Sequence, residues 1–169
     1  MVEPAPFDPY TVLAALERRR VSYIVVGSFA RVVRGAEELP DGIDLVPASR
    51  IENLRRLEGA LIDLGAERAD GESLALDEAT LGRDVIVELT SPQGELKVVS
   101  QPAGTRGYDD LRRAATREYL GRGLRPSIAS TGDLARMLGA LSREQDVSKL
   151  HALRRVAELE RSLGHELTL

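Results

Sequence analysis

The sequence predicts an α+β fold, in which a small mixed β-sheet is packed with helices and followed by a helical C-terminal segment. Short runs rich in β-branched residues, each ended by glycine or proline, fall before about residue 100, and longer helical patterns dominate after it. The 169 residues, 43% of them hydrophobic and 30% charged, suit one globular domain. We therefore expect a single domain over 1–169, with a sheet-containing core over 1–102 and the helical segment over 103–169.

The first helix is predicted to begin at Asp8-Pro9, because an aspartate accepts hydrogen bonds from the first turn and proline fits the first helical position. Apolar residues then recur at helical spacing as far as the arginines at 18–20, which suit the C-terminal end of a helix. Residues 21–26 are β-branched and aromatic, so they predict a buried strand that ends at the turn 27–28.

The next elements are a short helix over 29–34, closed by Gly35, and a second strand over 43–46. The helix over 51–64 has the clearest pattern, with leucine or isoleucine every three or four residues and Gly65 after the last turn.

Further strands are predicted at 73–76 and 84–89, and a turn at 91–94 joins the second of these to a strand at 95–100 as a hairpin. Helices are predicted after the sheet at 108–120, 131–141 and 147–163.

Composition excludes several classes of protein. Without cysteine, the chain has no disulfides, thiolate nucleophiles or cysteine-ligated metal sites. It has no apolar run of the ~20 residues that a membrane span needs and no start typical of a signal peptide, so we expect a cytoplasmic protein. The net charge of −4 argues against a nucleic-acid binder over the whole surface, yet it permits a local basic groove.

One group of residues could carry chemistry. A hydrophobic strand ends at Gly27-Ser28, a short helix follows, and Asp44 stands in the next strand. Glycine lets the backbone approach a ligand, a serine hydroxyl can bond phosphate oxygens, and strand carboxylates can hold Mg²⁺. The pattern indicates phosphate chemistry, although glycine and serine after a strand also form ordinary turns.

Several motifs together resemble the nucleotidyltransferase superfamily, in particular the small bacterial proteins of the minimal and abortive-infection type. The resemblance covers about residues 10–160 and rests on separate segments: YIVVGSFA from Tyr23, Gly35, IDLV from Ile43, TSPQGELKVV from Thr90, PAGTRGYDDL from Pro102 and IASTGDLARM from Ile128. It implies an enzyme that transfers a nucleoside monophosphate from a nucleoside triphosphate (NTP) to an acceptor. Three strand carboxylates would hold two Mg²⁺ ions, and the Gly-Ser turn would grip the triphosphate.

The sequence departs from the family pattern at two of the metal ligands. Gly42 occupies the first acidic position of the Asp-x-Asp pair, which leaves Asp44 there, and Lys97 occupies the position of the third carboxylate. Two close divalent ions need several negative oxygens, and a lysine adds repulsion, so the two-metal mechanism should fail. We therefore expect a degenerate site in which Asp44 is the remaining metal ligand. The residues expected to bind nucleotide or phosphate are Gly27, Ser28, Arg31 and Lys97.

Other acids offer an alternative. A bulge at Gly42 would turn Asp41 toward Asp44, and Asp84 and Glu88 share one face of the neighbouring predicted strand. An active enzyme would use Asp44 with Asp41 and one of those two acids, and it would need Mg²⁺ and an NTP. A degenerate protein would need no cofactor.

The charge of Lys97 suggests a specific arrangement. Its ammonium group would face Asp44 and take the place of the missing metal, either in a buried ion pair or in contact with a phosphate. The alternative is that Lys97 reaches solvent and Asp44 caps a turn.

Three functions therefore remain open. The leading one is a catalytically degenerate protein with at most weak nucleotide or phosphate binding, acting as a regulatory partner of the toxin–antitoxin or phage-defence kind. The second is an active Mg²⁺-dependent nucleotidyltransferase, and the third is an interaction module without a ligand. The expected partners are a nucleotide or a protein, and not a membrane.

A basic stretch after the sheet could contact nucleic acid, but interleaved acids favour ordinary ion pairs on the surface. Its arginines are Arg112, Arg113, Arg117, Arg122 and Arg125, and the acids are Asp109, Asp110 and Glu118.

Overall fold

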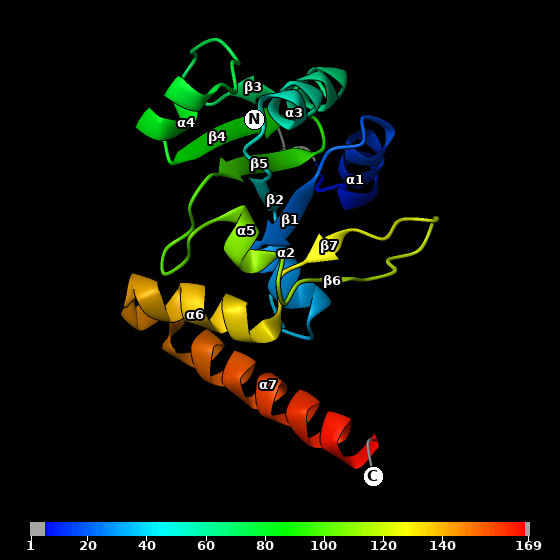
Figure 1. Cartoon of the computed structure of the whole chain (residues 1–169), viewed down its shortest axis with the longest axis vertical. Helices are drawn as coiled ribbons and strands as arrows, with labels where there is room; N and C mark the ends of the chain where they lie inside the picture. The colour runs from blue at the N-terminus through cyan, green and yellow to red at the C-terminus, as the bar shows by residue number, and fades with distance from the viewer. Residues whose placement is uncertain (1–5, 168–169) are drawn as a thin grey trace.

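The structure is a computed structural model that describes residues 6–167, with side chains as far as residue 164, and its centre is a mixed sheet (Figure 1). The strands are Tyr23–Val26 (β1), Gly42–Pro47 (β2), Glu67–Arg68 (β3), Ile86–Ser91 (β4), Gly94–Val99 (β5), Thr116–Arg117 (β6) and Ser127–Ile128 (β7). They are arranged in the order β3-β4-β5-β2-β1-β7-β6. Because β1 is antiparallel to β2 but parallel to β7, and β2 is parallel to β5, the predicted mixed sheet is confirmed.

The predicted helices of the N-terminal half are confirmed with small changes at their ends. The helices of the chain are Pro9–Arg18 (α1), Gly27–Val33 (α2), Ile51–Asp63 (α3), Glu78–Arg83 (α4), Tyr108–Leu111 (α5), Thr131–Leu141 (α6) and Val147–Leu167 (α7), with a 3-10 turn at Glu144–Asp146 (η1). Asp8 caps α1 as expected, since its carboxylate accepts a hydrogen bond of 3.2 Å from the amide of Thr11. Helix α2 begins at Gly27, within the turn that follows β1.

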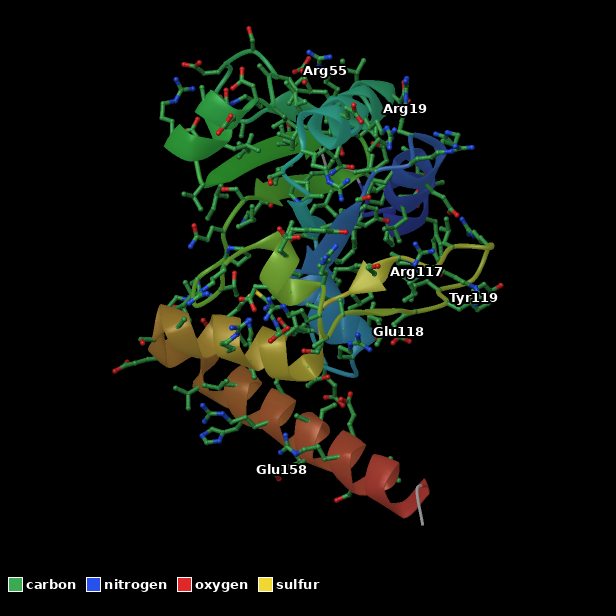
Figure 2. All side chains as sticks on the ribbon, in the orientation of Figure 1. Arg19, Arg55, Arg117, Glu118, Tyr119 and Glu158 are labelled. Atoms are coloured by element: carbon green, nitrogen blue, oxygen red, sulfur yellow. The ribbon has the colours of Figure 1, made fainter. Side chains whose placement is uncertain are left out.

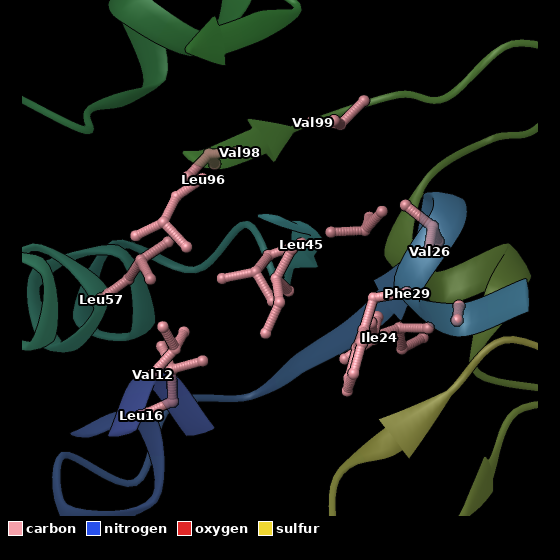
Figure 3. Close-up of a cluster of buried hydrophobic side chains, with 14 of the residues drawn as sticks. Val12, Leu16, Ile24, Val26, Phe29, Leu45, Leu57, Leu96, Val98 and Val99 are labelled. Carbon is pink, nitrogen blue, oxygen red and sulfur yellow. The ribbon is translucent and has the colours of Figure 1, made fainter. Parts of the chain in front are cut away.

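The two faces of the sheet differ in what covers them. On one face, Leu45 of β2 and Val98 of β5 are fully buried, together with Val12 of α1 and Leu57 of α3 (Figure 3). Side chains alternate between the faces of a strand, so Asp44 lies on the opposite face. That second face is bordered by α2 and α6 and contains a cavity.

Two predicted strands need correction. Residues 73–76 are irregular, and the edge strand next to β4 is instead the short β3, which precedes them. The strand predicted from residue 84 begins at Ile86, because Asp84 ends α4 and its carboxylate forms an ion pair with Arg68 (3.2 Å).

The helix predicted over 108–120 is wrong beyond its first turn. Helix α5 stops at Leu111, and residues 116–117 of the segment expected to be helical form β6, which pairs with β7 as a hairpin at the edge of the sheet. Arg34, at the end of α2, holds this hairpin. Its guanidinium donates to the carbonyl of Ile128 (2.9 Å) and to the carboxylate of Glu118 (2.7 Å). The sequence of residues 108–120 could not reveal this contact, because Arg34 lies 84 positions before Glu118.

The last two long helices are close to the prediction. Helix α6 spans the predicted residues, with Ser130 as its cap, and α7 packs against it and extends away from the sheet (Figure 1). None of the helices in the described part of the chain combines the length and the apolar character that a membrane span requires.

Candidate functional site

A row of side chains crosses the second face of the sheet. In register, Val26 of β1 is opposite Asp44 of β2, Asp44 is opposite Lys97 of β5, and Lys97 is opposite Glu88 of β4. Cross-strand partners point to the same face of a sheet, so a lysine stands between two carboxylates in this row.

A cavity of about 410 Å³ lies over the inner part of this row. Its polar lining comes from the start of α2 and from β2 and β5, while α6 supplies an apolar wall. The polar residues include Gly27, Ser28, Arg31, Asp41, Asp44 and Lys97, and the wall is formed by Leu134, Met137, Leu138 and Leu141. Of the predicted site residues, Asp84 lies elsewhere, in its ion pair with Arg68, and Glu88 borders a smaller neighbouring hollow of about 130 Å³.

Gly27 is required at the turn for two reasons. Its φ of +75° is in the left-handed region that favours glycine. A Cβ atom placed on it would also lie 2.5 Å from Oδ2 of Asp44, which is well inside van der Waals contact. The Asp44 carboxylate therefore packs directly against the glycine backbone at the entrance to α2.

The surroundings of Asp44 act on its pKa in opposite directions. Burial raises the pKa of this carboxyl above its usual range, and the negative charges of Asp41 and Glu88 add to the rise. The positive charges of Lys97 and Arg31 oppose it without cancelling it. Asp44 is thus a partly buried acid that ionises less readily than an exposed aspartate.

Lys97 acts on Asp44 from a distance. Among the described residues, Lys97 forms no ion pair within 4.0 Å, so the direct Asp44–Lys97 pair considered from the sequence does not form. Lys97 lines both the main cavity and the hollow beside Glu88.

Gly42 cannot simply be replaced by an acid in this backbone. A Cβ atom at Gly42 would lie 2.0 Å from the carbonyl oxygen of Glu95 on the neighbouring strand. Asp41, one residue earlier, precedes β2 and is therefore outside the strand alternation, and it lines the same cavity as Asp44. The two aspartates share the cavity even though residues three apart in a regular strand point to opposite faces.

The carboxylates do not fit a two-metal site. No group of three or more histidine, cysteine, aspartate or glutamate side chains within the described residues is arranged to hold a metal ion. Lys97 separates Asp44 from Glu88 in the row, and its positive charge opposes a divalent cation there.

Arg31 is held in place by a residue that sequence reasoning missed. Its guanidinium donates two hydrogen bonds to Glu38, of 2.7 and 2.9 Å, and both side chains are nearly buried, at 12% and 11% exposure. Lys149 at the start of α7 also lies 3.5 Å from Glu38. The hydrogen bonds with Arg31 are the main reason that the pKa of Glu38 is lowered. No periodic pattern marks Glu38, because it lies in the irregular loop between α2 and β2.

The sheet order, the Gly-Ser turn and the acid on the adjacent strand define the nucleotidyltransferase fold, which solved structures confirm. The solution structure of the antibiotic-resistance factor ANT(2'')-Ia aligns over 93% of this chain and 95% of its own, with a TM-score of 0.52 and 16% identity. The crystal structure of ANT(2'')-Ia in complex with adenylyl-2''-tobramycin aligns over 94% of this chain and 88% of its own, with a TM-score of 0.53 and 18% identity. No protein-family model and no curated protein matches the chain. At these identities the likeness concerns the fold alone.

Proposed function

We propose that this chain is a catalytically degenerate nucleotidyltransferase-fold protein that binds a nucleotide, weakly and without a divalent cation. The observation that carries the proposal is the position of Lys97. It lies in register between Asp44 and Glu88, on the face of the sheet where the cavity opens.

Phosphate binding in the cavity would use three groups. The Ser28 hydroxyl can donate a hydrogen bond, and Arg31 and Lys97 supply positive charge. Because Glu38 already holds the guanidinium of Arg31, we expect that group to contribute mainly its charge and Lys97 to make the direct contact.

The remainder of the cavity suits a nucleobase. Met137 and Leu138 of α6, with Val99 of β5, form an apolar wall opposite the polar turn. Ligand sites of this kind combine an apolar surface with a few polar groups that fix orientation. A nucleotide would place its phosphates near Ser28 and its base against α6.

A protein that binds a nucleotide without transferring it can regulate a partner. We propose such a role here, in a toxin–antitoxin or phage-defence pair, with the nucleotide controlling the association. The location would be the cytoplasm, where nucleoside triphosphates are abundant.

One observation favours a second function. Asp41 and Asp44 line the same cavity, so an active Mg²⁺-dependent enzyme would have two carboxylates within it. This alternative requires Lys97 to move away from Asp44 when the cation binds.

Thermal unfolding of the full chain with each of the four ribonucleoside triphosphates tests the proposal, with Mg²⁺ in one series and EDTA in the other. We expect at least one triphosphate to raise the Tm equally in both series, because a ligand that binds the folded state stabilises it. Lys97→Met should remove the rise, and Arg55→Gln, on the exposed side of α3, is the matched control for loss of a charge.

Two results would overturn the proposal. A rise in Tm that requires Mg²⁺ would establish the active-enzyme alternative. A Tm unchanged by all four triphosphates would leave an interaction module without a ligand.

A further inference from the structure

A second surface, away from the nucleotide cavity, combines exposed arginines with tyrosines. Helix α1 and the β6–β7 hairpin border two hollows, of about 330 and 210 Å³, which share no lining residue with the nucleotide cavity. We name this surface the arginine–tyrosine face. It consists of Arg18, Arg20, Arg117, Arg122 and Arg125 with Tyr10, Tyr23, Tyr108 and Tyr119.

The arginines of this face are available to a partner. All five are exposed, and within the described residues none of them forms an ion pair within 4.0 Å, whereas Arg112 of the same basic stretch pairs with Asp109 (3.7 Å). The interleaved acid Glu118 does not neutralise them, because its carboxylate bonds Arg34. Figure 2 shows Arg117 and Glu118 on opposite sides of the hairpin, with Arg117 toward α1. Glu17 also lines the larger hollow, so five arginines stand against this one lining acid, and the face is positive on a chain whose net charge is −4.

The face also gathers all four tyrosines of the chain, which has no tryptophan. The guanidinium carbon of Arg122 lies 4.2 Å from the ring centre of Tyr10, and that of Arg125 lies 5.4 Å from the ring centre of Tyr119. Tyr119 is 62% exposed, and its ring lies beside the guanidinium of Arg125. Tyr10, Tyr23 and Tyr108 are half-buried against the core, so the exposed planar groups of the face are Tyr119 and the arginine guanidiniums.

Hydrogen bonds from Arg34 position the hairpin side of the face. Through Arg34, the end of α2 is hydrogen-bonded to the backbone of Ile128 and Ala129 (2.9 and 3.0 Å) and to Glu118 of the hairpin. Arg20 and Arg122 of the arginine–tyrosine face adopt left-handed backbone conformations, with φ of +54° and +53°. Glycine or asparagine is more common than arginine in this conformation. Each of these charges stands at a sharp turn on the rim of the face.

We propose that the arginine–tyrosine face binds single-stranded nucleic acid. Arginines contact the phosphates of a strand, and tyrosine and guanidinium planes stack on its unpaired bases. A duplex hides its base faces and an acidic peptide has none, so neither would use the tyrosines. The proposal does not depend on nucleotide binding in the other cavity, since the two sites share no residue.

Fluorescence anisotropy with the full chain tests this inference, using labelled single strands of RNA and of DNA, about ten nucleotides long. We expect binding to at least one strand, with an affinity that falls as salt rises. The double variant Arg117→Gln/Arg125→Gln should weaken binding and reduce the slope of log K against log salt by about 1.4, since each phosphate contact to a single strand contributes about 0.7. The matched control is Arg55→Gln/Arg56→Gln on α3, which removes two exposed charges elsewhere and should bind as the wild type does.

The aromatic contribution is tested separately at the exposed Tyr119. Tyr119→Leu should weaken binding about tenfold, and Tyr119→Phe, which keeps the stacking ring, should not. Lys97→Met should leave strand binding unchanged, which separates this face from the nucleotide cavity.

The proposal is overturned if the wild type does not bind either strand, or if the α3 control loses as much affinity as the hairpin variant. It is also overturned if a duplex or heparin binds as tightly as the single strand and Tyr119→Leu has no effect. That result would define a general polyanion surface.

Discussion

Asp44 and Lys97 are register partners on parallel strands, and the charge of Lys97 opposes the rise in the pKa of Asp44 without an ion pair within 4.0 Å among the described residues. The lysine stands where the resemblance to nucleotidyltransferases expects a metal-binding acid. The charge at the register position beside Asp44 is therefore positive.

Replacing Lys97 by aspartate should restore a site for a divalent cation. Lys97→Asp would place two carboxylates in adjacent register positions, with Glu88 beside them, and like charges at that spacing destabilise the fold by about 1 kcal/mol. Mg²⁺ should then raise the Tm of the variant and leave that of the wild type unchanged. Lys97→Met is the uncharged control, and a Tm of Lys97→Asp that does not respond to Mg²⁺ would count against the assignment of this row as the former metal site.

The pKa of Asp44 predicts a pH dependence of stability. Because burial raises this pKa in the folded state, the folded protein binds the proton more tightly, and ionisation of Asp44 destabilises it as the pH rises through the folded pKa. Asp44→Asn should therefore raise the Tm at pH 7 by about a few degrees. The advantage should shrink as the pH falls through the folded pKa and disappear below the unfolded value of 3.8, where both states are protonated.

Thermal scans of both proteins between acidic and neutral pH would measure this effect. Asp109→Asn, at an exposed position of α5, is the control for loss of a surface carboxylate. A constant difference in Tm across the pH range would show that burial of the Asp44 charge is not its cause.

Gly27→Ala should destabilise the fold through contact with Asp44. The matched control is Gly123→Ala, because Gly123 has nearly the same φ (+76° against +75°) with no atom within 4 Å of the added Cβ. Both variants bear the cost of a left-handed alanine, about 1 kcal/mol, and Gly27→Ala should lose a further 1–3 kcal/mol, approximately, from overpacking.

Chemical denaturation would give both free energies of unfolding. The additional variant Asp44→Ala should remove most of the difference between Gly27→Ala and Gly123→Ala, since it deletes the atoms that the new Cβ meets. Equal losses for the two glycine variants would contradict the close packing of Gly27 against Asp44.

Arg34→Met should destabilise the chain by about 2–4 kcal/mol, because it removes hydrogen bonds to two backbone carbonyls and to the Glu118 carboxylate. Arg34→Lys should recover little, since an ammonium group cannot reproduce the fork of a guanidinium. Hydrogen exchange would locate the loss in the β6–β7 hairpin, and Arg154→Met, exposed on α7, should have no such effect. Unchanged protection of the hairpin in Arg34→Met would refute the anchoring role.

Helix caps and hydrophobic spacing within short segments predicted several helices correctly. The Asp8 cap bonds the first turn of its own helix, and the leucine spacing of α3 can be recognised within a single segment, so both helices were predictable from short stretches of sequence. The Gly-Ser turn was also predictable, because a positive φ after a buried strand demands a residue such as Gly27.

The sequence by itself determined the α+β class and the strands that form the centre of the sheet. Only the tertiary structure decided that residues 116–128 form a hairpin, that Asp41 lines the same cavity as Asp44, and that arginines and tyrosines gather on one face. The physical reason is the range of the interactions. Capping and hydrophobic periodicity act within a few residues, whereas the hydrogen bonds of Arg34 and the field around Asp44 join groups that only the folded chain brings together.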